Sequence, residues 1–240
     1  MQYLGSKNRI SKHLKPIIES YLVDKKQYIE PFVGGANMID KIEFDNKIGS
    51  DINKYLIALL NKMKRKPEAI PDTITEKEYN EVKTHKDDYE LWYVGLVGFC
   101  ASFGAKWFGG FARRKNGDDV PSQAIRNIKK QADKIKDIKF QYCGYENYHD
   151  VKDSVIYCDI PYSGTTKYKD NFDKEAFIDF LLELDESNTI LVSEYSMPEK
   201  YFTKIWEKEV TVNVGGINKN SKKEIEKLFI LDKNKIKCYA

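Results

Sequence analysis

The chain has 240 residues, of which 41% are hydrophobic and 13% aromatic, and its formal net charge is +3. A chain of this size buries enough surface for one large domain, or a domain with one insertion, without stabilising disulfides or metals. Its four cysteines show no CxxC spacing, which argues against a zinc ribbon and against a disulfide scaffold. We therefore expect a packed globular protein from an intracellular, reducing compartment.

The sequence predicts neither a membrane span nor a signal peptide. Its most apolar stretch, Leu91 to Phe111, is interrupted by five glycines and by Lys106. The first five residues lack the charged start and apolar core of a signal peptide. We expect a cytoplasmic protein, in a bacterial cell, with no membrane partner.

Charge is segregated along the chain. Residues 106–139 hold ten Lys or Arg against four acids, and residues 219–237 hold seven Lys against three acids. Such segregation suits a polyanionic partner, although a solvated helix face would have a similar sequence.

The first 63 residues read as alternating helices and strands. Residues 10–22 have helical spacing, and a strand near 28–33 runs through Gly34-Gly35 into a short helix at 38–42. A second strand at 47–51 ends on an acid, and a helix follows at 55–63. This order indicates a parallel sheet.

The remainder of the chain divides into a helical stretch and a return to the sheet. Residues 72–139 are charged and mostly helical, around an aromatic, glycine-rich centre. Strands are then expected at 154–159 and 189–193 and helices at 172–184 and 198–206, before two late strands, 210–214 and 227–231, that pair as a hairpin. The predicted fold is an α/β sheet domain, residues 1–63 and 140–240, with a mainly helical insertion, residues 64–139.

Three acids stand at or near the ends of predicted strands, namely Glu30, Asp51 and Asp159. Ligands of open parallel sheets bind beyond the carboxyl ends of the strands. Gly34 and Gly35 would let the backbone approach a ligand closely, and Asp51 is placed to accept hydrogen bonds from ribose hydroxyls. An ordinary tight turn explains the glycines equally well, because neither G-x-G-x-x-G nor a phosphate-binding P-loop is present.

The segment Asp159-Ile160-Pro161-Tyr162 is more informative. Pro161 cannot continue a central strand and keeps Ile160 out of a helix, so the chain should stay extended just past the sheet. Two acceptors and an aromatic ring presented together suit a planar amine. The alternative is a strand-ending aspartate followed by a turn proline.

Four segments occur in one order, Tyr3 to Lys7, Glu30 to Gly35, Ser50 to Asn53 and Tyr157 to Tyr162. In this order they resemble the motifs of the Dam-like (alpha-class) DNA adenine N6-methyltransferases, a family that includes phage members. The resemblance covers residue 3 to about residue 232. It implies a Rossmann-like, S-adenosylmethionine-dependent methyltransferase sheet whose insertion is the target-recognition domain.

The resemblance also implies site residues, with S-adenosylmethionine as methyl donor and no metal. Cofactor contacts are expected from Tyr3, Lys7, Glu30, Pro31, Phe32, Gly34, Asp51, Tyr145 and Asp159. Catalytic roles fall to Asp159, Ile160, Pro161 and Tyr162: the carboxylate and the Ile160 carbonyl would accept the hydrogens of adenine N6, and Tyr162 would stack on the flipped base. Family members commonly read Asp-Pro-Pro-Tyr, so Ile160 predicts a less rigid loop and a lower rate.

The segment Phe103 to Gly117 interleaves aromatic residues, glycines and cations, as a DNA-contacting loop would. Lysines would track phosphates and arginines would read guanine edges. The alternative is that the aromatic residues pack against helices and the cations are merely solvated. The predicted DNA contacts are Lys106, Arg113, Arg114, Lys115 and Arg126.

The leading hypothesis is a site-specific adenine methyltransferase acting on double-stranded DNA, for which GATC is a first guess from the resemblance. We expect a monomer, with a dimer on DNA as the alternative. The resemblance leaves open a solitary enzyme, a phage enzyme or one partner of a restriction–modification pair. Competing hypotheses are methylation of RNA or of a protein amide, and a DNA-binding relative whose activity has decayed.

Overall fold

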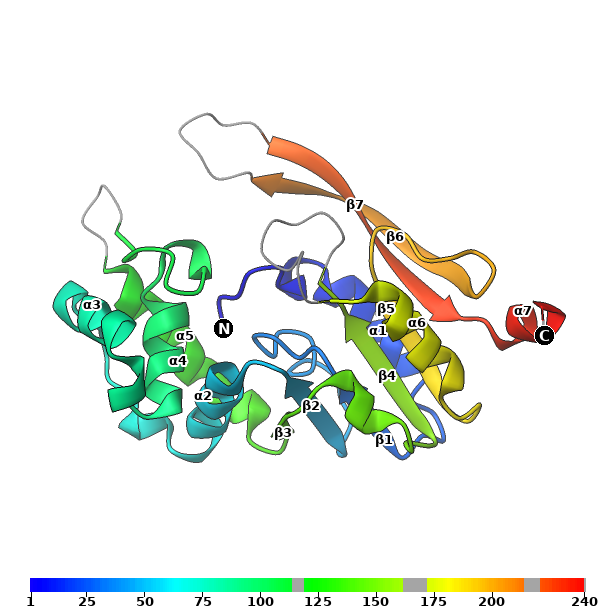
Figure 1. The fold of residues 1–240 in the computed structure, drawn as a ribbon, viewed down its shortest axis with the longest axis horizontal. Helices are drawn as coiled ribbons and strands as arrows, with labels where there is room; N and C mark the ends of the chain where they lie inside the picture. The colour runs from blue at the N-terminus through cyan, green and yellow to red at the C-terminus, as the bar shows by residue number, and fades with distance from the viewer. Residues whose placement is uncertain (114–118, 162–171, 214–220, 240) are drawn as a thin grey trace. The chain divides into compact units, whose positions relative to one another are not determined.

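The computed structural model describes residues 1–113, 119–161, 172–213 and 221–239. In these ranges seven strands form a sheet in the order β3-β2-β1-β4-β5-β7-β6, with helices between the strands, so the predicted α/β class is confirmed (Figure 1). The strands are β1 (Gln27–Glu30), β2 (Lys47–Asp51), β3 (Lys139–Tyr142), β4 (Ser154–Asp159), β5 (Thr189–Ser193), β6 (Phe202–Asn213) and β7 (Ser221–Leu231). The helices are α1 (Ser11–Ser20), α2 (Lys54–Arg65), α3 (Glu76–Thr84), α4 (Leu91–Cys100), α5 (Val120–Ile135), α6 (Lys174–Glu183) and α7 (Lys233–Tyr239).

The chain divides into two compact units. The first contains residues 1–20 and 31–145, and the second contains residues 21–30 and 146–240. This division is one of packing and does not follow the predicted boundaries at residues 63 and 140. The assignment of residues 64–139 as a separate recognition domain stays a prediction.

A parallel ladder forms the centre of the second unit. Strand β4 pairs with β1 on one side and with β5 on the other, both in parallel. Residues Ser154 to Cys158 are all buried, as expected for a central parallel strand covered on both faces. Asp159 lies opposite Ser193 at the carboxyl end of this ladder.

The two late strands form a hairpin as predicted, but it is longer than predicted, and residues 210–213 pair with residues 221–224 rather than with 227–231. Strands β6 and β7 pair in antiparallel fashion from Phe202 opposite Leu231 to Asn213 opposite Ser221, and they run side by side in Figure 1. The predicted helix over residues 198–206 is therefore wrong, because residues 199–201 form a turn and residues 202–206 open strand β6. The apolar residues there fit helical spacing, but cross-strand pairing with β7 decides their conformation.

A second predicted element is also absent from the described structure. Residues 38–42 form turns rather than a helix, although Met38, Ile39 and Ile42 are buried. A five-residue helix gains too few hydrogen bonds to offset its nucleation cost. Instead the Lys47 ammonium donates hydrogen bonds to the carbonyls of Ile39 (3.4 Å) and Ile42 (2.9 Å).

The predicted helical character of residues 72–139 is confirmed in the described part of that range, which contains α3, α4 and α5. Helix α2 begins at an N-cap, Asn53, whose side chain accepts hydrogen bonds from the backbone N–H groups of Tyr55 and Leu56. Helices α2 and α4 approach closely at Gly95, where an added Cβ would lie 2.3 Å from the carbonyl oxygen of Tyr55. None of the described helices is both long enough and apolar enough to cross a bilayer.

This close approach predicts an inverted effect for Gly95→Ala. Replacing glycine by alanine inside a helix normally stabilises it, but here the new methyl group must push α4 away from α2. We expect the free energy of unfolding to fall by about 1–3 kcal/mol, measured by urea denaturation. The exposed Asn80→Ala in α3 is the control and should change it by less than about 0.5 kcal/mol.

Candidate active site

Asp51 ends strand β2 in the first unit and is held by the backbone. Its carboxylate accepts hydrogen bonds from the N–H groups of Gly34 (3.2 Å) and Asn53 (2.9 Å). Burial raises the pKa of Asp51 to about 6, although both hydrogen bonds act to lower it. The group is thus mainly ionised at neutral pH, and each oxygen keeps a lone pair with which to accept a further hydrogen bond.

Two exposed apolar side chains flank this carboxylate, and sequence reasoning missed both. Ile52, the next residue, is 73% exposed, and Tyr142, which pairs with Asp51 across the β2–β3 register, is 62% exposed. The one signal in the sequence for Ile52 was its place after a strand-ending acid. A hydrogen-bond acceptor with exposed apolar residues at neighbouring positions in the chain and in the sheet suits a ligand that combines hydroxyl groups with a flat apolar ring.

The structure brings Tyr3, Gly34 and Asp51 together. Gly34 has φ +48°, a left-handed conformation that favours glycine, and a Cβ added there would lie 2.9 Å from the Tyr3 ring. Tyr3 also packs on Phe99 of helix α4, with ring centroids 5.5 Å apart. The glycine turn therefore makes room for the tyrosine ring, which a side chain at position 34 would displace.

The first unit also contains the predicted cofactor residues Pro31, Phe32, Lys7 and Tyr145. Phe32 and Tyr145 stack with ring centroids 5.8 Å apart, so the structure joins these two predicted residues. The carbonyl of Pro31 accepts a hydrogen bond from Ser50 beside Asp51 (3.4 Å). Lys7 is buried within a short 3-10 helix, Lys7–Arg9.

Glu30 and Asp159 belong to the second unit, at neighbouring strand ends. The buried Glu30 carboxylate accepts a hydrogen bond from the Tyr28 hydroxyl (2.7 Å). Burial is the main cause that raises the pKa of the Cys158 thiol, and the negative charges of Asp159 and Glu30 raise it further. The structure thus brings these two predicted residues into one acidic cluster.

Residues after Asp159 follow the predicted pattern as far as they are described. Strand β4 ends at Asp159, so the proline at position 161 stands outside the ladder, as expected. The Ile160 side chain is buried and Pro161 is half-buried. Beneath this strand end the Tyr157 hydroxyl and the Ser193 hydroxyl share a 2.9 Å hydrogen bond. Tyr162 lies outside the described residues.

Glu194 lies directly after strand β5, and the sequence did not predict that it would be buried. Its side chain is 1% exposed, and one oxygen accepts a hydrogen bond from the backbone of Tyr195 (2.6 Å). The other oxygen lies 3.5 Å from the Lys174 ammonium, close enough for an ion pair but without hydrogen-bond geometry. Lys174 itself donates to the carbonyl of Ser196 (2.9 Å).

The predicted DNA contacts fall into three groups. Lys106 and Arg126 are exposed. Arg113 is exposed as well, but its guanidinium forms an ion pair with Glu76 of helix α3. Arg114 and Lys115 lie outside the described residues. The cations that are described can thus reach a ligand from solvent, and Arg113 would have to leave its partner to do so.

The aromatic residues of the same segment pack against helices, which was the alternative to DNA contact. Trp107 lies 4.8 Å from Phe99 and 5.1 Å from Tyr55, measured between ring centroids. Phe108 and Phe111 both pack on Tyr79 of helix α3. These rings form the core of the insertion.

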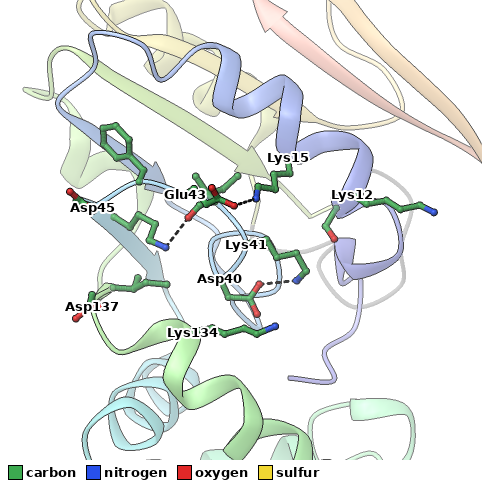
Figure 2. Close-up of a pocket in the computed structure, with 13 residues that line it drawn as sticks. Lys12, Lys15, Asp40, Lys41, Glu43, Asp45, Lys134 and Asp137 are labelled. Carbon is green, nitrogen blue, oxygen red and sulfur yellow. Dashed lines mark hydrogen bonds and ion pairs between the residues drawn. The ribbon is translucent and has the colours of Figure 1, made fainter.

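A separate cavity of about 950 Å³ lies in the first unit, and none of the predicted site residues lines it (Figure 2). Its walls carry lysines and acids in nearly equal number, and four of these residues form the ion pairs Lys15–Glu43 and Lys41–Asp40. This near balance of charge gives the cavity little electrostatic preference for an anion or a cation. In the described part of the chain, no group of three or more His, Cys, Asp or Glu side chains is placed to hold a metal ion.

Comparison with known proteins shows which proteins this chain is similar to. Residues 3–93 match the family model of the D12 class N6 adenine-specific DNA methyltransferases. The resemblance to the Dam-like family is confirmed. The matched segment contains Tyr3, Lys7, Glu30, Gly34 and Asp51, and it ends before the aromatic loop and Asp159.

Two curated relatives are the DNA adenine methylases of Vibrio cholerae serotype O1, strains O395 and El Tor Inaba N16961. Each is 26% identical to this chain over 169 residues, which is 61% of this chain and 60% of the relative. The chain therefore matches about three fifths of their length. A putative precorrin-6Y C5,15-methyltransferase domain from Corynebacterium diphtheriae covers 94% of this chain and 98% of its own length, with 10% identity and a TM-score of 0.36, too low to argue from.

Removing only Lys174 from the Lys174–Glu194 pair should destabilise the protein more than removing the charges of both residues. Lys174→Ala leaves a buried carboxylate without its counter-charge, so the free energy of unfolding should fall by about 2 kcal/mol, less than for a fully buried pair. Adding Glu194→Gln to that variant removes the uncompensated charge and should recover most of the loss. Urea denaturation of both single variants and the double variant checks this, and additive losses would contradict it.

Proposed function

We propose that this protein transfers a methyl group from S-adenosylmethionine to N6 of an adenine in double-stranded DNA. The observation that carries the proposal is the end of strand β4, where Asp159 is followed by Ile160 and by a proline that stops the ladder. The match of residues 3–93 to an adenine-specific family supports the same reaction. The proposal places the enzyme in the bacterial cytoplasm, acting as a monomer.

The residues of the first unit fit the proposed methyl donor. When bound, S-adenosylmethionine supplies an activated methyl group on a sulfonium. The ionised Asp51 carboxylate would accept the ribose hydroxyls, and the exposed Ile52 and Tyr142 would cover the adenine ring of the cofactor. Tyr3 beside the Gly34 turn, Lys7, and the Phe32–Tyr145 stack complete the set within this unit, and Glu30, Pro31 and Asp159 are the remaining contacts proposed.

Asp159 and Ile160 would prepare the acceptor amine. Adenine N6 is a weak nucleophile because its lone pair is delocalised into the ring. Hydrogen bonds from its two N–H groups to the Asp159 carboxylate and the Ile160 carbonyl would draw the nitrogen towards tetrahedral geometry. The same acceptors stabilise the positive charge that grows on nitrogen, and the remaining task of the protein is to align the two reactants.

Duplex DNA is the substrate that the insertion favours. The described cations Lys106 and Arg126 are exposed and free to contact phosphates, and Arg113 would exchange Glu76 for DNA. An exposed salt bridge of this kind costs little to break, at most about 1 kcal/mol. The target adenine must leave the base stack to reach Asp159, at a cost of a few kcal/mol.

The direct test is transfer of a labelled methyl group from S-adenosylmethionine to unmethylated duplex DNA, followed by nucleoside analysis. N6-methyladenine is the expected product, and sequencing of the modified sites gives the recognition sequence. RNA and protein offered in competition should remain unlabelled. Cofactor binding without transfer to any DNA would overturn the proposal and favour a decayed relative.

Asp159→Ala should lower the transfer rate by about a thousandfold, because it removes an acceptor that is needed as charge develops on the amine. Its affinity for duplex DNA should stay within a few-fold of the wild type, since the proposed phosphate contacts lie in the insertion. Single-turnover kinetics and fluorescence anisotropy with the same oligonucleotide measure the two quantities. Parallel loss of both would count against the assigned role.

The raised pKa of Asp51 predicts that cofactor affinity falls in mild acid. Below about pH 6 the carboxylate is protonated and loses acceptor strength, so the dissociation constant for S-adenosylmethionine should rise about fivefold between pH 6 and pH 5. Titration calorimetry across this range measures the slope. Asp51→Asn should bind weakly and without that slope, and a slope that persists belongs to another group, such as the Met1 amino group, whose pKa is lowered to about 6.

A further inference from the structure

Gln131 is a buried polar side chain on helix α5, and its partners lie around the glycine turn of the proposed cofactor site. It is 5% exposed, on a helix face whose other buried residues are apolar. Its Nε2 group donates to the carbonyls of Gly35 (3.2 Å) and Ala36 (3.1 Å) and to a carboxylate oxygen of Asp40 (2.9 Å). An amide nitrogen has two hydrogens, so the three acceptors share them. Because a buried amide without partners is costly, these bonds tie α5 to the turn.

The turn has a backbone conformation that depends on its surroundings. Gly34 (φ +48°) and Ala36 (φ +55°) both adopt the left-handed region, which alanine rarely occupies. Such conformations persist where neighbouring groups hold them. The Ala36 N–H group donates to the carbonyl of Val33 (2.9 Å), and the Ala36 carbonyl accepts from Gln131, 95 residues further along the chain. Gln131 therefore supplies a constraint that comes from outside the turn.

The same amide also holds the segment that carries Tyr3. The Oε1 atom of Gln131 accepts a hydrogen bond from the Met1 nitrogen. Asn37 accepts from the same nitrogen (2.9 Å) and donates to the Met1 carbonyl (2.8 Å). A Cβ added at Gly35 would lie 2.8 Å from Tyr3 Cβ and 2.8 Å from the Asn37 amide nitrogen. The segment and the turn are thus packed together without spare room.

Through the turn, Gln131 is linked to the proposed ribose-binding carboxylate. The Gly34 N–H group donates to Asp51 (3.2 Å), and Gly34 directly precedes Gly35, whose carbonyl is bonded to Gln131. A displacement of the turn would therefore weaken the bond to Asp51. In the described part of the chain, the hydrogen-bond partners of the Gln131 side chain all lie within residues 1–40, and none of them is a proposed cofactor contact. Its effect on a ligand would be exerted through the turn.

We propose that Gln131 is a positioning residue, which strengthens the binding of S-adenosylmethionine by holding the Gly34–Ala36 turn against Asp51. The identity of the ligand rests on the proposed function. Gln131 acts on the turn and not on the groups proposed to bind the acceptor amine, Asp159 and Ile160. Its loss should therefore weaken cofactor binding and leave the methyl-transfer step unchanged once the cofactor is saturating.

The test is Gln131→Met, which keeps the length and approximate volume of the side chain and removes its hydrogen bonds. Equilibrium dialysis with radiolabelled S-adenosylmethionine should give a dissociation constant about tenfold higher than that of the wild type. At saturating cofactor, the single-turnover rate on duplex DNA should stay within about twofold of the wild type. Gln123→Met, the same change at an exposed position of the same helix, is the control and should leave both quantities unchanged.

A double-mutant cycle with Asp51→Asn separates positioning from a general loss of structure. If Gln131 acts through the Gly34–Asp51 bond, Gln131→Met should weaken binding by only about twofold in the Asp51→Asn background. An equal loss in both backgrounds would overturn the inference, and so would an unchanged affinity in the single variant.

Two further variants control for stability and folding. Ile125→Val shortens a buried side chain of the same helix and lowers stability, but its affinity for the cofactor should match that of the wild type. Gln131→Asn keeps the amide on a side chain one methylene shorter, which cannot span the same distance. It should weaken binding as Gln131→Met does, and it replaces that variant if the methionine protein does not fold.

The binding measurements keep this inference separate from the proposed function, because they do not require turnover. A wild type that binds S-adenosylmethionine but methylates no DNA would overturn the proposed function alone. A wild type that does not bind S-adenosylmethionine would overturn both.

Discussion

The parallel pairing of β4 with β5 determines which side chains lie beside Asp159 at the end of strand β4. Because Asp159 lies opposite Ser193, the two residues share a face of the sheet, and so do Tyr157 and Leu191. A shift of one residue would turn Asp159 to the opposite face and bury it among apolar side chains. The hydrogen bond between Tyr157 and Ser193, and the position of Glu194 just past the strand, depend on the same register.

The sequence alone predicted the elements whose apolar pattern fits only one type of secondary structure. The buried run before Asp159 and the apolar spacing of residues 55–63 each have one reading, and both elements form as predicted. Residues 202–206 have two readings, since their apolar residues suit a helix or a strand, and only the partner strand β7 distinguishes them. Strand β3 was missed because its four residues, Lys139–Tyr142, have too short a pattern to stand out between a helix and a turn.

The candidate site divides in a similar way. Asp51 and Gly34 could be predicted because an acid and a glycine at strand ends are uncommon enough to stand out, and their hydrogen bond joins them in the structure. Ile52, Tyr142 and Glu194 could not, because nothing in an isoleucine or a tyrosine reveals exposure, and nothing in a glutamate reveals burial. Such properties arise from packing between segments distant in sequence. The assigned roles of all these residues stay predictions.

The anchoring of the aromatic loop separates what folds the insertion from what the insertion presents. Tyr79, Trp107 and Phe108 hold the loop from inside, while Phe103 and Lys106 face solvent. Exposed side chains contribute little to stability, so substitutions at the outer positions leave the scaffold intact. If the insertion binds DNA as proposed, a few surface changes could alter its preference while the fold stays the same.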